Sequence, residues 1–249
     1  MRRNGLTPYP WQEEFLRLRP YRALICWARQ AGGKSTALSA AILSQCFYRA
    51  GSLVLISSYT EEKSKDLLAK SVLLHGPYAK EFPLTIDSTK RKRFRNGSQI
   101  WALSGKTGAP RGATAHLVVF DEAAWTEDEL RNNAVATMQT TDGPMWAVST
   151  PPETPERWWW AAWTANGLYT AEEALIVNDG WFRSYRPVSQ CPNRNQSFLD
   201  SEKSKINEVT YMREYECQFP GFAAFYAGRP FSPAMIAGIP ESENAGWGV

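Results

Sequence analysis

The chain has 249 residues, of which 43% are hydrophobic, so it can bury the core of one domain with a small appendage. Its formal net charge of +3 at pH 7 permits a polyanionic partner without requiring one. With only two histidines, a Ser-His-Asp triad or a His-rich metal site is not favoured. The four cysteines are widely spaced, and we interpret them as buried thiols in a reducing compartment. Because no apolar run approaches membrane-spanning length and no signal-peptide core follows Met1, we expect a soluble, cytoplasmic protein.

The first elements along the chain alternate between helix and strand. Prolines in the first turn with acidic residues behind them predict an N-terminal helix that Pro20 ends. Two apolar runs, 22–27 and 52–58, are typical of strands, and each precedes a segment with helical spacing, 35–50 and 61–74. This alternation predicts an α/β fold with a mainly parallel sheet.

A glycine-bearing turn joins the first strand to the helix after it: Trp27-Ala28-Arg29-Gln30-Ala31-Gly32-Gly33-Lys34-Ser35-Thr36. Strand, turn and helix in this order are the context of a phosphate-binding loop, in which backbone N–H groups and the positive end of the helix dipole face phosphate oxygens. Lys34 would reach the outer phosphates and the Ser35 hydroxyl would meet Mg²⁺. The usual pattern is G-x-x-x-x-G-K-[ST], and here Ala28 takes the place of the first glycine. The alternative is an ordinary Gly-Gly turn with a solvated lysine.

A basic hairpin is predicted next. The run 90–95 has five basic residues in six, and Asn96-Gly97 before the alternating run 100–103 is a strong hairpin signal. Such charges are typical of a solvated sheet edge that resists aggregation. The alternative is contact with the phosphates of DNA without base recognition.

Two carboxylates, Asp121 and Glu122, end the apolar strand that begins at Leu117. We expect this strand to lie beside the strand of the phosphate loop in a parallel sheet, so that its carboxyl end faces the phosphates. Asp121 would then hold the water shell of the metal, while Glu122 would position and deprotonate the attacking water. An acidic cap at a strand end is the alternative, but a phosphate loop upstream makes it less favoured.

The later elements are less regular. Residues 126–129 supply a capping box for a helix toward Met138. Further predicted elements are a strand at 144–149, a tryptophan-rich helix at 157–163, a strand at 181–187 and short helices at 200–205 and 208–217. We expect Trp158-Trp159-Trp160 to pack in the core or at a subunit interface. The domain organisation that we predict is a core at 1–189, a small helical lid or linker subdomain at 190–240 and a linker at 241–249.

Four short motifs in combination resemble the ATPase domain of viral large terminase subunits, the motors that pump double-stranded DNA into phage capsids. They are Arg29-Gln30 before Gly-Lys-Ser, Arg111-Gly112, the apolar run into Asp121-Glu122-Ala123-Ala124, and Ser149-Thr150-Pro151. The resemblance implies a P-loop NTPase of the RecA/ASCE type with a mainly parallel central sheet flanked by helices. It also implies ATP and Mg²⁺ as cofactors, and as partners double-stranded DNA, a portal protein, a small terminase subunit and a homo-oligomeric ring, expected to be a pentamer. In isolation we expect a monomer, and during infection a location in the host cytoplasm at the procapsid portal.

The resemblance also implies roles for single residues. Gln12 would contact the adenine edge, and Ser149 with Thr150 would sense the γ-phosphate and relay its loss to movement. The nucleotide-binding residues would be Gln12, Arg29, Gln30, Ala31, Gly32, Gly33, Lys34, Ser35 and Thr36; the metal ligands Ser35 and Asp121; and the catalytic residues Glu122, Arg29, Arg111 and Thr150. The family has two residues between the arginine and Gly-Lys, whereas this chain has three, so Arg29 is expected to reach either the nucleotide or a neighbouring element.

Arg111 has two possible roles: it anchors its glycine-flanked loop to a carboxylate, or it is an arginine finger for the ATP site of a neighbouring subunit. The last residues, Trp247-Gly248-Val249, resemble the start of the nuclease that follows the ATPase in terminases, so we expect a chain cut at that point and without nuclease activity. Two other functions stay open, a helicase-like DNA-dependent ATPase and an ATP-binding DNA scaffold without turnover.

Overall fold

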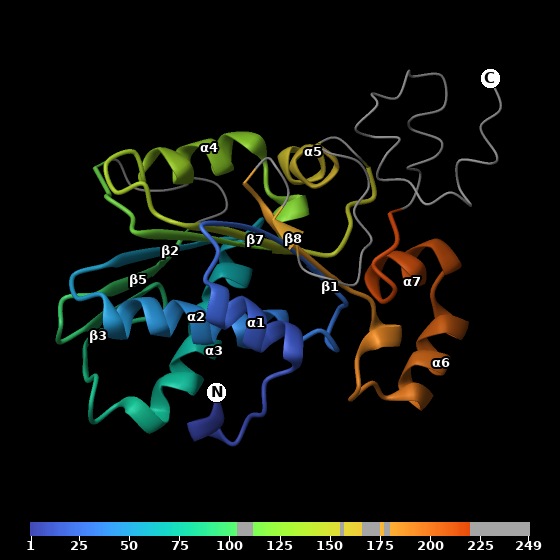
Figure 1. The fold of residues 1–249 in the computed structure, drawn as a ribbon, viewed down its shortest axis with the longest axis horizontal. Coiled ribbons are helices and arrows are strands. Elements are labelled where there is room, and N and C mark those ends of the chain that lie inside the picture. Colours follow the sequence, from blue (N-terminus) through green and yellow to red (C-terminus); the bar gives the residue numbers. More distant parts are fainter. Residues whose placement is uncertain (104–111, 155–156, 166–174, 177–179, 220–249) are drawn as a thin grey trace.

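The computed structural model describes residues 1–103, 112–154, 157–165, 175–176 and 180–219 (Figure 1). Within these residues one sheet has nine strands in the order β3-β4-β5-β2-β6-β7-β1-β9-β8. The strands are β1 Arg22–Trp27, β2 Leu53–Ser57, β3 Leu84–Asp87, β4 Arg91–Phe94, β5 Gln99–Ala102, β6 Leu117–Asp121, β7 Met145–Ser149, β8 Leu175–Ile176 and β9 Phe182–Arg186. The α-helices are α1 Pro10–Leu18, α2 Lys34–Tyr48, α3 Glu61–His75, α4 Asp128–Ala136, α5 Trp158–Thr164, α6 Gln196–Lys205 and α7 Glu208–Glu214. Short 3₁₀ turns are η1 Arg2–Asn4, η2 Gly76–Tyr78, η3 Ala123–Trp125 and η4 Val188–Gln190.

The sheet lies between two helical layers. Helices α1, α2 and α3 cover one face, and α4 and α5 cover the other, with α6 and α7 together at one end (Figure 1). Alternate residues of β1 enter opposite cores: Leu24 and Cys26 pack with the α4–α5 side, while Ile25 and Trp27 pack with the α1–α3 side. A strand buried on both faces explains the continuous apolar run, and the predicted α/β fold with a mainly parallel sheet flanked by helices is confirmed.

The centre of the sheet is parallel, as predicted, but one expected neighbour is wrong. β6, which carries the two carboxylates, does not lie beside β1, because β7 is inserted between them. The crossover through α2 carries the chain past two strand positions to β2, and β6 and β7 later fill that gap. The register places Cys26 of β1 opposite Ser149 of β7, and Val148 opposite Asp121 of β6, so the three carboxyl ends form one edge.

The predicted hairpin is confirmed and explains most of the basic run. β4 and β5 pair antiparallel, and Gly97 at their turn has a φ of 85°, which an L side chain would resist. Three of the five cations have protein partners: Lys90 pairs with Glu61, Lys92 pairs with Asp87, and Arg91 bonds Gln99 and lies over the Trp101 ring. Arg93 and Arg95 have exposed side chains, so the DNA contact stays a prediction that rests on these two.

Most other predicted elements form where expected, with local corrections. β3 and the two-residue β8 were not predicted, since both are short and lie at or near the edges of the sheet. The capping box at Thr126 is wrong: Thr126 ends η3 in an extended conformation, Glu127 takes the N-cap of α4, and neither caps the helix with its side chain.

The tryptophans of α5 belong to the core, as expected. Trp159, Trp160 and Trp163 are at most 3% exposed, and all three rings lie against Phe219. The four cysteines are free and buried, as predicted. None of the helices in the described parts of the chain is long and apolar enough to cross a membrane.

The C-terminal helices pack on the core. Leu199 of α6 and Tyr211 of α7 join the hydrophobic cluster on the α4–α5 side. The division into a core at 1–189 and a lid at 190–240 stays a prediction, and the proposed linker at 241–249 lies outside the described residues.

Candidate functional site

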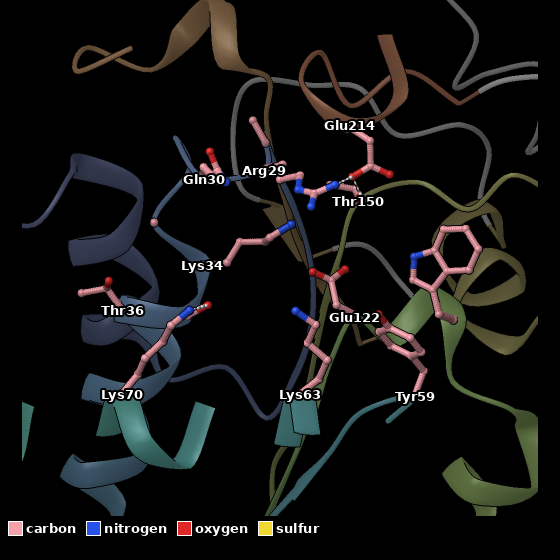
Figure 2. A pocket seen from close by; sticks show the side chains of 14 residues that line it. Arg29, Gln30, Lys34, Thr36, Tyr59, Lys63, Lys70, Glu122, Thr150 and Glu214 are labelled. Carbon is pink, nitrogen blue, oxygen red and sulfur yellow. Dashed lines mark hydrogen bonds and ion pairs between the residues drawn. The ribbon is translucent and has the colours of Figure 1, made fainter. Parts of the chain in front are cut away.

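A cavity of about 720 Å³ opens at the edge where β1, β7 and β6 end (Figure 2). It is the place at which an open parallel sheet normally binds its ligand. Its lining comes from the predicted phosphate loop and from four other parts of the chain: Ala28, Arg29, Gln30, Gly33, Lys34, Ser35, Thr36, Tyr59, Lys63, Lys70, Glu122, Trp125, Thr150 and Glu214. The structure therefore brings together the loop, one carboxylate and the Thr150 motif that the sequence singled out.

The loop has a conformation that its glycines make possible. Gly33 is the N-cap of α2 and has a φ of 67°, and a Cβ there would lie 2.3 Å from Nε2 of Gln12. A Cβ at Gly32 would lie 2.7 Å from Cβ of Trp27 and 2.9 Å from the Ala28 carbonyl oxygen. The two glycines thus allow a tight turn against β1 that leads directly into the N-terminus of α2.

Lys34 supports the phosphate-loop interpretation most strongly. It is only 8% exposed, and among the described residues its ammonium has no hydrogen-bond partner. A buried cation without a partner is costly, so this ammonium fits an anionic ligand in the cavity. The alternative of a solvated lysine is wrong. In Figure 2 its Nζ extends into the space toward Glu122.

Helix α1 holds the back of the loop. Trp11 Nε1 donates to the Gly32 carbonyl at 3.2 Å, and Gln12 Nε2 donates to the Gly33 carbonyl at 2.9 Å. The other amide atom of Gln12 accepts from the Tyr9 backbone N–H at 2.8 Å, and the residue is 3% exposed. The structure thus gives Gln12 a loop-positioning role, and its adenine contact stays a prediction.

The two carboxylates of β6 differ in their surroundings. Asp121 is buried, and burial together with the Glu122 charge raises its pKa to about 6, against the opposing effect of Lys34 and Lys70. Glu122 has a φ of 52°, and this left-handed turn directs its carboxylate into the cavity (Figure 2). A strained, non-glycine conformation of this kind is frequent at functional sites. One acid is thus held in the sheet and the other faces the cavity, and the separate roles of the two stay a prediction.

The metal site that the sequence predicts is incomplete without a ligand. No group of three or more His, Cys, Asp or Glu that could hold a metal ion occurs among the described residues. The Ser35 hydroxyl accepts a hydrogen bond from Lys70 at 3.2 Å. Ser35 and Asp121 are nevertheless suitable oxygen donors for Mg²⁺, which proteins commonly bind through few side chains together with substrate phosphates.

Ser149 and Thr150 end β7 between the loop and the carboxylates. The Ser149 hydroxyl accepts from the Ala124 backbone N–H at 3.2 Å, in the turn that follows Glu122. The Thr150 hydroxyl donates to Oε2 of Glu214 at 3.3 Å. The predicted coupling motif is therefore bonded both to the turn after Glu122 and to α7.

Arg29 turns toward a neighbouring element. Its guanidinium lies 3.8 Å from Oε2 of Glu214, and its side chain is 60% exposed at the cavity wall. Arg111, the other predicted catalytic arginine, lies outside the described residues.

Five lining residues were missed by sequence reasoning: Tyr59, Lys63, Lys70, Trp125 and Glu214. Lys63 and Lys70 are seven residues apart on α3, a spacing that places both on one helical face, and α3 follows directly from β2. That pattern was available in the sequence. Glu214 had no local signal, because only tertiary packing brings α7 to the loop.

Comparison with known proteins is consistent with this geometry. Residues 24–219 match the family described as "Terminase large subunit, T4likevirus-type, N-terminal". The ATPase domain of the large terminase from Thermus phage P74-26 has a similar structure, with a TM-score of 0.72 and 18% identity over 88% of this chain and 96% of that chain.

Two longer proteins share the fold. A large terminase from a thermophilic bacteriophage, in complex with ADP, gives a TM-score of 0.68 and 11% identity over 85% of this chain and 54% of its own. The large terminase of bacteriophage HK97 gives 0.64 and 14% over 86% and 51%. The chain thus spans about half of these two proteins. Among curated proteins the sequence has no match.

Proposed function

The chain belongs to the terminase large subunit family, and we propose that it is an ATP-hydrolysing motor domain that drives translocation of double-stranded DNA into a procapsid. The observation that carries the proposal is the buried, unpartnered ammonium of Lys34 in the same cavity as Glu122. Nucleotide hydrolysis needs a cation that binds the phosphates and a carboxylate that orients the attacking water, and Lys34 and Glu122 can supply these two groups. The complexes of a relative with ADP and ATP-gamma-S support the choice of nucleotide.

The phosphates of ATP would lie on the loop 28–36. Backbone N–H groups at the start of α2 and the positive end of its dipole favour negative charge there. Lys34 would neutralise the outer phosphates, and Thr36, which also lines the cavity, would add a hydroxyl. The side chains of Trp11 and Gln12 in α1, which donate to the Gly32 and Gly33 carbonyls, would hold the loop in this conformation.

Mg²⁺ would be held by Ser35 and Asp121 and would neutralise charge on the phosphates. Lys70 then has to release the Ser35 hydroxyl, to which it now donates. Asp121 must be ionised to serve as a ligand, and with a pKa of about 6 it is mostly ionised above neutral pH.

Glu122 would orient the attacking water and accept its proton. Its left-handed backbone directs the carboxylate into the cavity (Figure 2), whereas Asp121 belongs to β6 and does not line the cavity. Thr150 and Arg29 would face the terminal phosphate from the other side of the cavity, and Ser149 would hold the turn that carries Glu122.

We further infer that the working form is a ring of identical subunits, expected to be a pentamer, that meets double-stranded DNA, a portal protein and a small terminase subunit in the host cytoplasm. Arg111 would serve a neighbouring subunit in that ring. The match of residues 24–219 to the terminase family supports this proposal over a helicase.

The test is ATP hydrolysis by the wild type, Glu122→Gln and the control Glu129→Gln, each with and without duplex DNA. Glu129 is exposed on α4, away from the cavity. A motor predicts turnover that Glu122→Gln loses by at least about a hundredfold and Glu129→Gln retains. Negligible turnover by all three proteins would favour the scaffold instead, and strand separation would favour the helicase.

A further inference from the structure

Two side chains from separate parts of the fold, together with that of the preceding residue, meet at the carboxylate of Glu214, the last residue of α7. Its Oε2 accepts from the Thr150 hydroxyl at 3.3 Å and lies 3.8 Å from the Arg29 guanidinium. Its Oε1 lies 3.1 Å from the guanidinium of Arg213. The Glu214 side chain is 12% exposed and lines the cavity beside Arg29 and Thr150 (Figure 2).

The backbone reinforces this contact. The Arg29 N–H donates to the Glu214 carbonyl at 2.9 Å, so the first residues of the loop are bonded to the end of α7 through main chain and side chain. An exposed loop residue that receives two such contacts is not free to move independently of the helix.

Arg213 connects the same helix to the carboxylate side of the cavity. Its guanidinium is buried, pairs with Glu153 at 2.6 Å and lies 5.5 Å from the ring of Trp125. Trp125 belongs to the turn directly after Glu122. Arg213 and Glu214 together thus touch the elements that end β1, β7 and β6.

Stability alone is a poor explanation for the Arg29–Glu214 pair. Arg29 is 60% exposed, and ion pairs with one exposed partner are screened by solvent and contribute little. Orientation of the Arg29 side chain is a better explanation. A long side chain at a cavity wall has many rotamers, and the largely buried carboxylate of Glu214 favours those that keep the guanidinium beside it.

We propose that Glu214 is a positioning residue, whose carboxylate holds the Arg29 guanidinium and the end of β7 at Thr150 beside the place that the terminal phosphate of bound nucleotide would take. The inference rests on the proposed function and adds to it a residue from the C-terminal helices. A phosphate that attracts Arg29 competes with Glu214 for the same guanidinium. The binding of ATP would therefore weaken the ion pair between the loop and α7.

The substitution Glu214→Gln separates charge from hydrogen bonding. The amide oxygen of glutamine can still accept from Thr150, but it no longer attracts Arg29. The control is Glu208→Gln, at the exposed first position of the same helix. The measurements are kcat and KM for ATP, the Kd for ATP-gamma-S by calorimetry, and amide hydrogen exchange of α7 with and without ATP-gamma-S.

We expect Glu214→Gln to lower kcat about tenfold, because small misplacements of reacting groups are costly, and to change the Kd less than about threefold. Glu208→Gln should match the wild type in both. In a double-mutant cycle, Glu214→Gln should add little further loss to Arg29→Gln, since Glu214 acts on the reaction through Arg29. A kcat of Glu214→Gln equal to that of Glu208→Gln, or fully multiplicative losses, would overturn the inference.

These measurements distinguish a failure of this inference from a failure of the proposed function. If the wild type binds ATP-gamma-S but does not hydrolyse ATP, the motor proposal fails, and exchange decides the inference: ATP-gamma-S should change exchange in α7 of the wild type and Glu208→Gln but not of Glu214→Gln. Equal changes in all three proteins would overturn it. If the wild type does not bind ATP-gamma-S, both proposals fall.

Discussion

The substitution Ser149→Ala tests whether the end of β7 supports the turn after Glu122, the proposed catalytic base. Ser149 is fully buried, and its hydroxyl accepts from the backbone N–H of Ala124, which is 2% exposed. Alanine removes the acceptor and leaves that buried N–H without its partner. A buried polar group that loses its partner costs about 1–3 kcal/mol, so the free energy of unfolding should fall by that amount.

A second serine provides a matched control. Ser39 of α2 is also 0% exposed, but its hydroxyl has no hydrogen-bond partner among the described residues. Ser39→Ala therefore removes a buried hydroxyl without stranding another group, and alanine also favours the helix. Its free energy of unfolding should equal or exceed that of the wild type.

Urea denaturation of the three proteins measures the difference, with thermal unfolding as a second method. In a chain of this size 1 kcal/mol corresponds to roughly 2–4 °C in Tm, so the expected shift for Ser149→Ala is easily resolved. The ATPase rate provides a functional readout. Because the stranded N–H lies in the turn that holds Glu122, kcat should also decrease in Ser149→Ala and stay unchanged in Ser39→Ala.

The reasoning is refuted if the two alanine variants are equally stable. It is also refuted if Ser149→Ala is destabilised but retains the full kcat, since the turn would then not depend on β7 for its catalytic geometry. Measurements at matched fractions of folded protein keep these two results distinct.

Three other predictions concern the loop, the buried acid and the basic hairpin. Gly32→Ala should distort the loop and raise the Kd for ATP-gamma-S at least about tenfold by calorimetry, because its Cβ would meet backbone at 2.9 Å, whereas Gly76→Ala has open space and should bind normally. In EDTA, the wild type should lose about 2 kcal/mol of stability relative to Asp121→Asn as pH rises from 4 to 7, because the raised pKa of about 6 at Asp121 favours the protonated folded state below that pH; urea titrations of both proteins measure the difference. If Arg93 and Arg95 contact DNA, changing both to glutamine should reduce the salt slope of duplex binding by about two units, and an unchanged slope would leave the hairpin a solvated edge.

Local sequence pattern was sufficient for most of the helices and strands and for the loop. Lys34 follows a glycine turn between an apolar strand and a helix, and each of these signals depends on neighbours within a few residues. The order of strands has no such signal. Nothing near Leu117 indicates that β7 will separate β6 from β1, because that order depends on how far the α2 crossover carries the chain.

The same distinction explains the site residues that were missed. Glu214 reaches the cavity only because α7 packs against the phosphate loop from nearly 200 residues away, and charge alone does not distinguish it from Glu208 on the same helix. Gln12 shows the converse: its residue type and place were predicted, but its amide is bonded to Tyr9 and Gly33 in the fold. Sequence thus identifies chemical types more readily than it identifies their partners.

The insertion of β7 between β1 and β6 has a mechanical consequence. Had the carboxylate strand paired directly with the loop strand, the phosphate loop and the catalytic turn would share backbone hydrogen bonds, and neither could shift without the other. Instead Ser149 bonds the turn after Glu122, while Thr150 bonds Glu214 of α7. Adjacent residues of one strand end thus hold two elements through single side-chain bonds of 3.2 and 3.3 Å, which are far easier to exchange than a sheet ladder. A small displacement at the terminal phosphate can therefore change the contacts of α7 while the sheet keeps its register, which is what the proposed motor cycle needs.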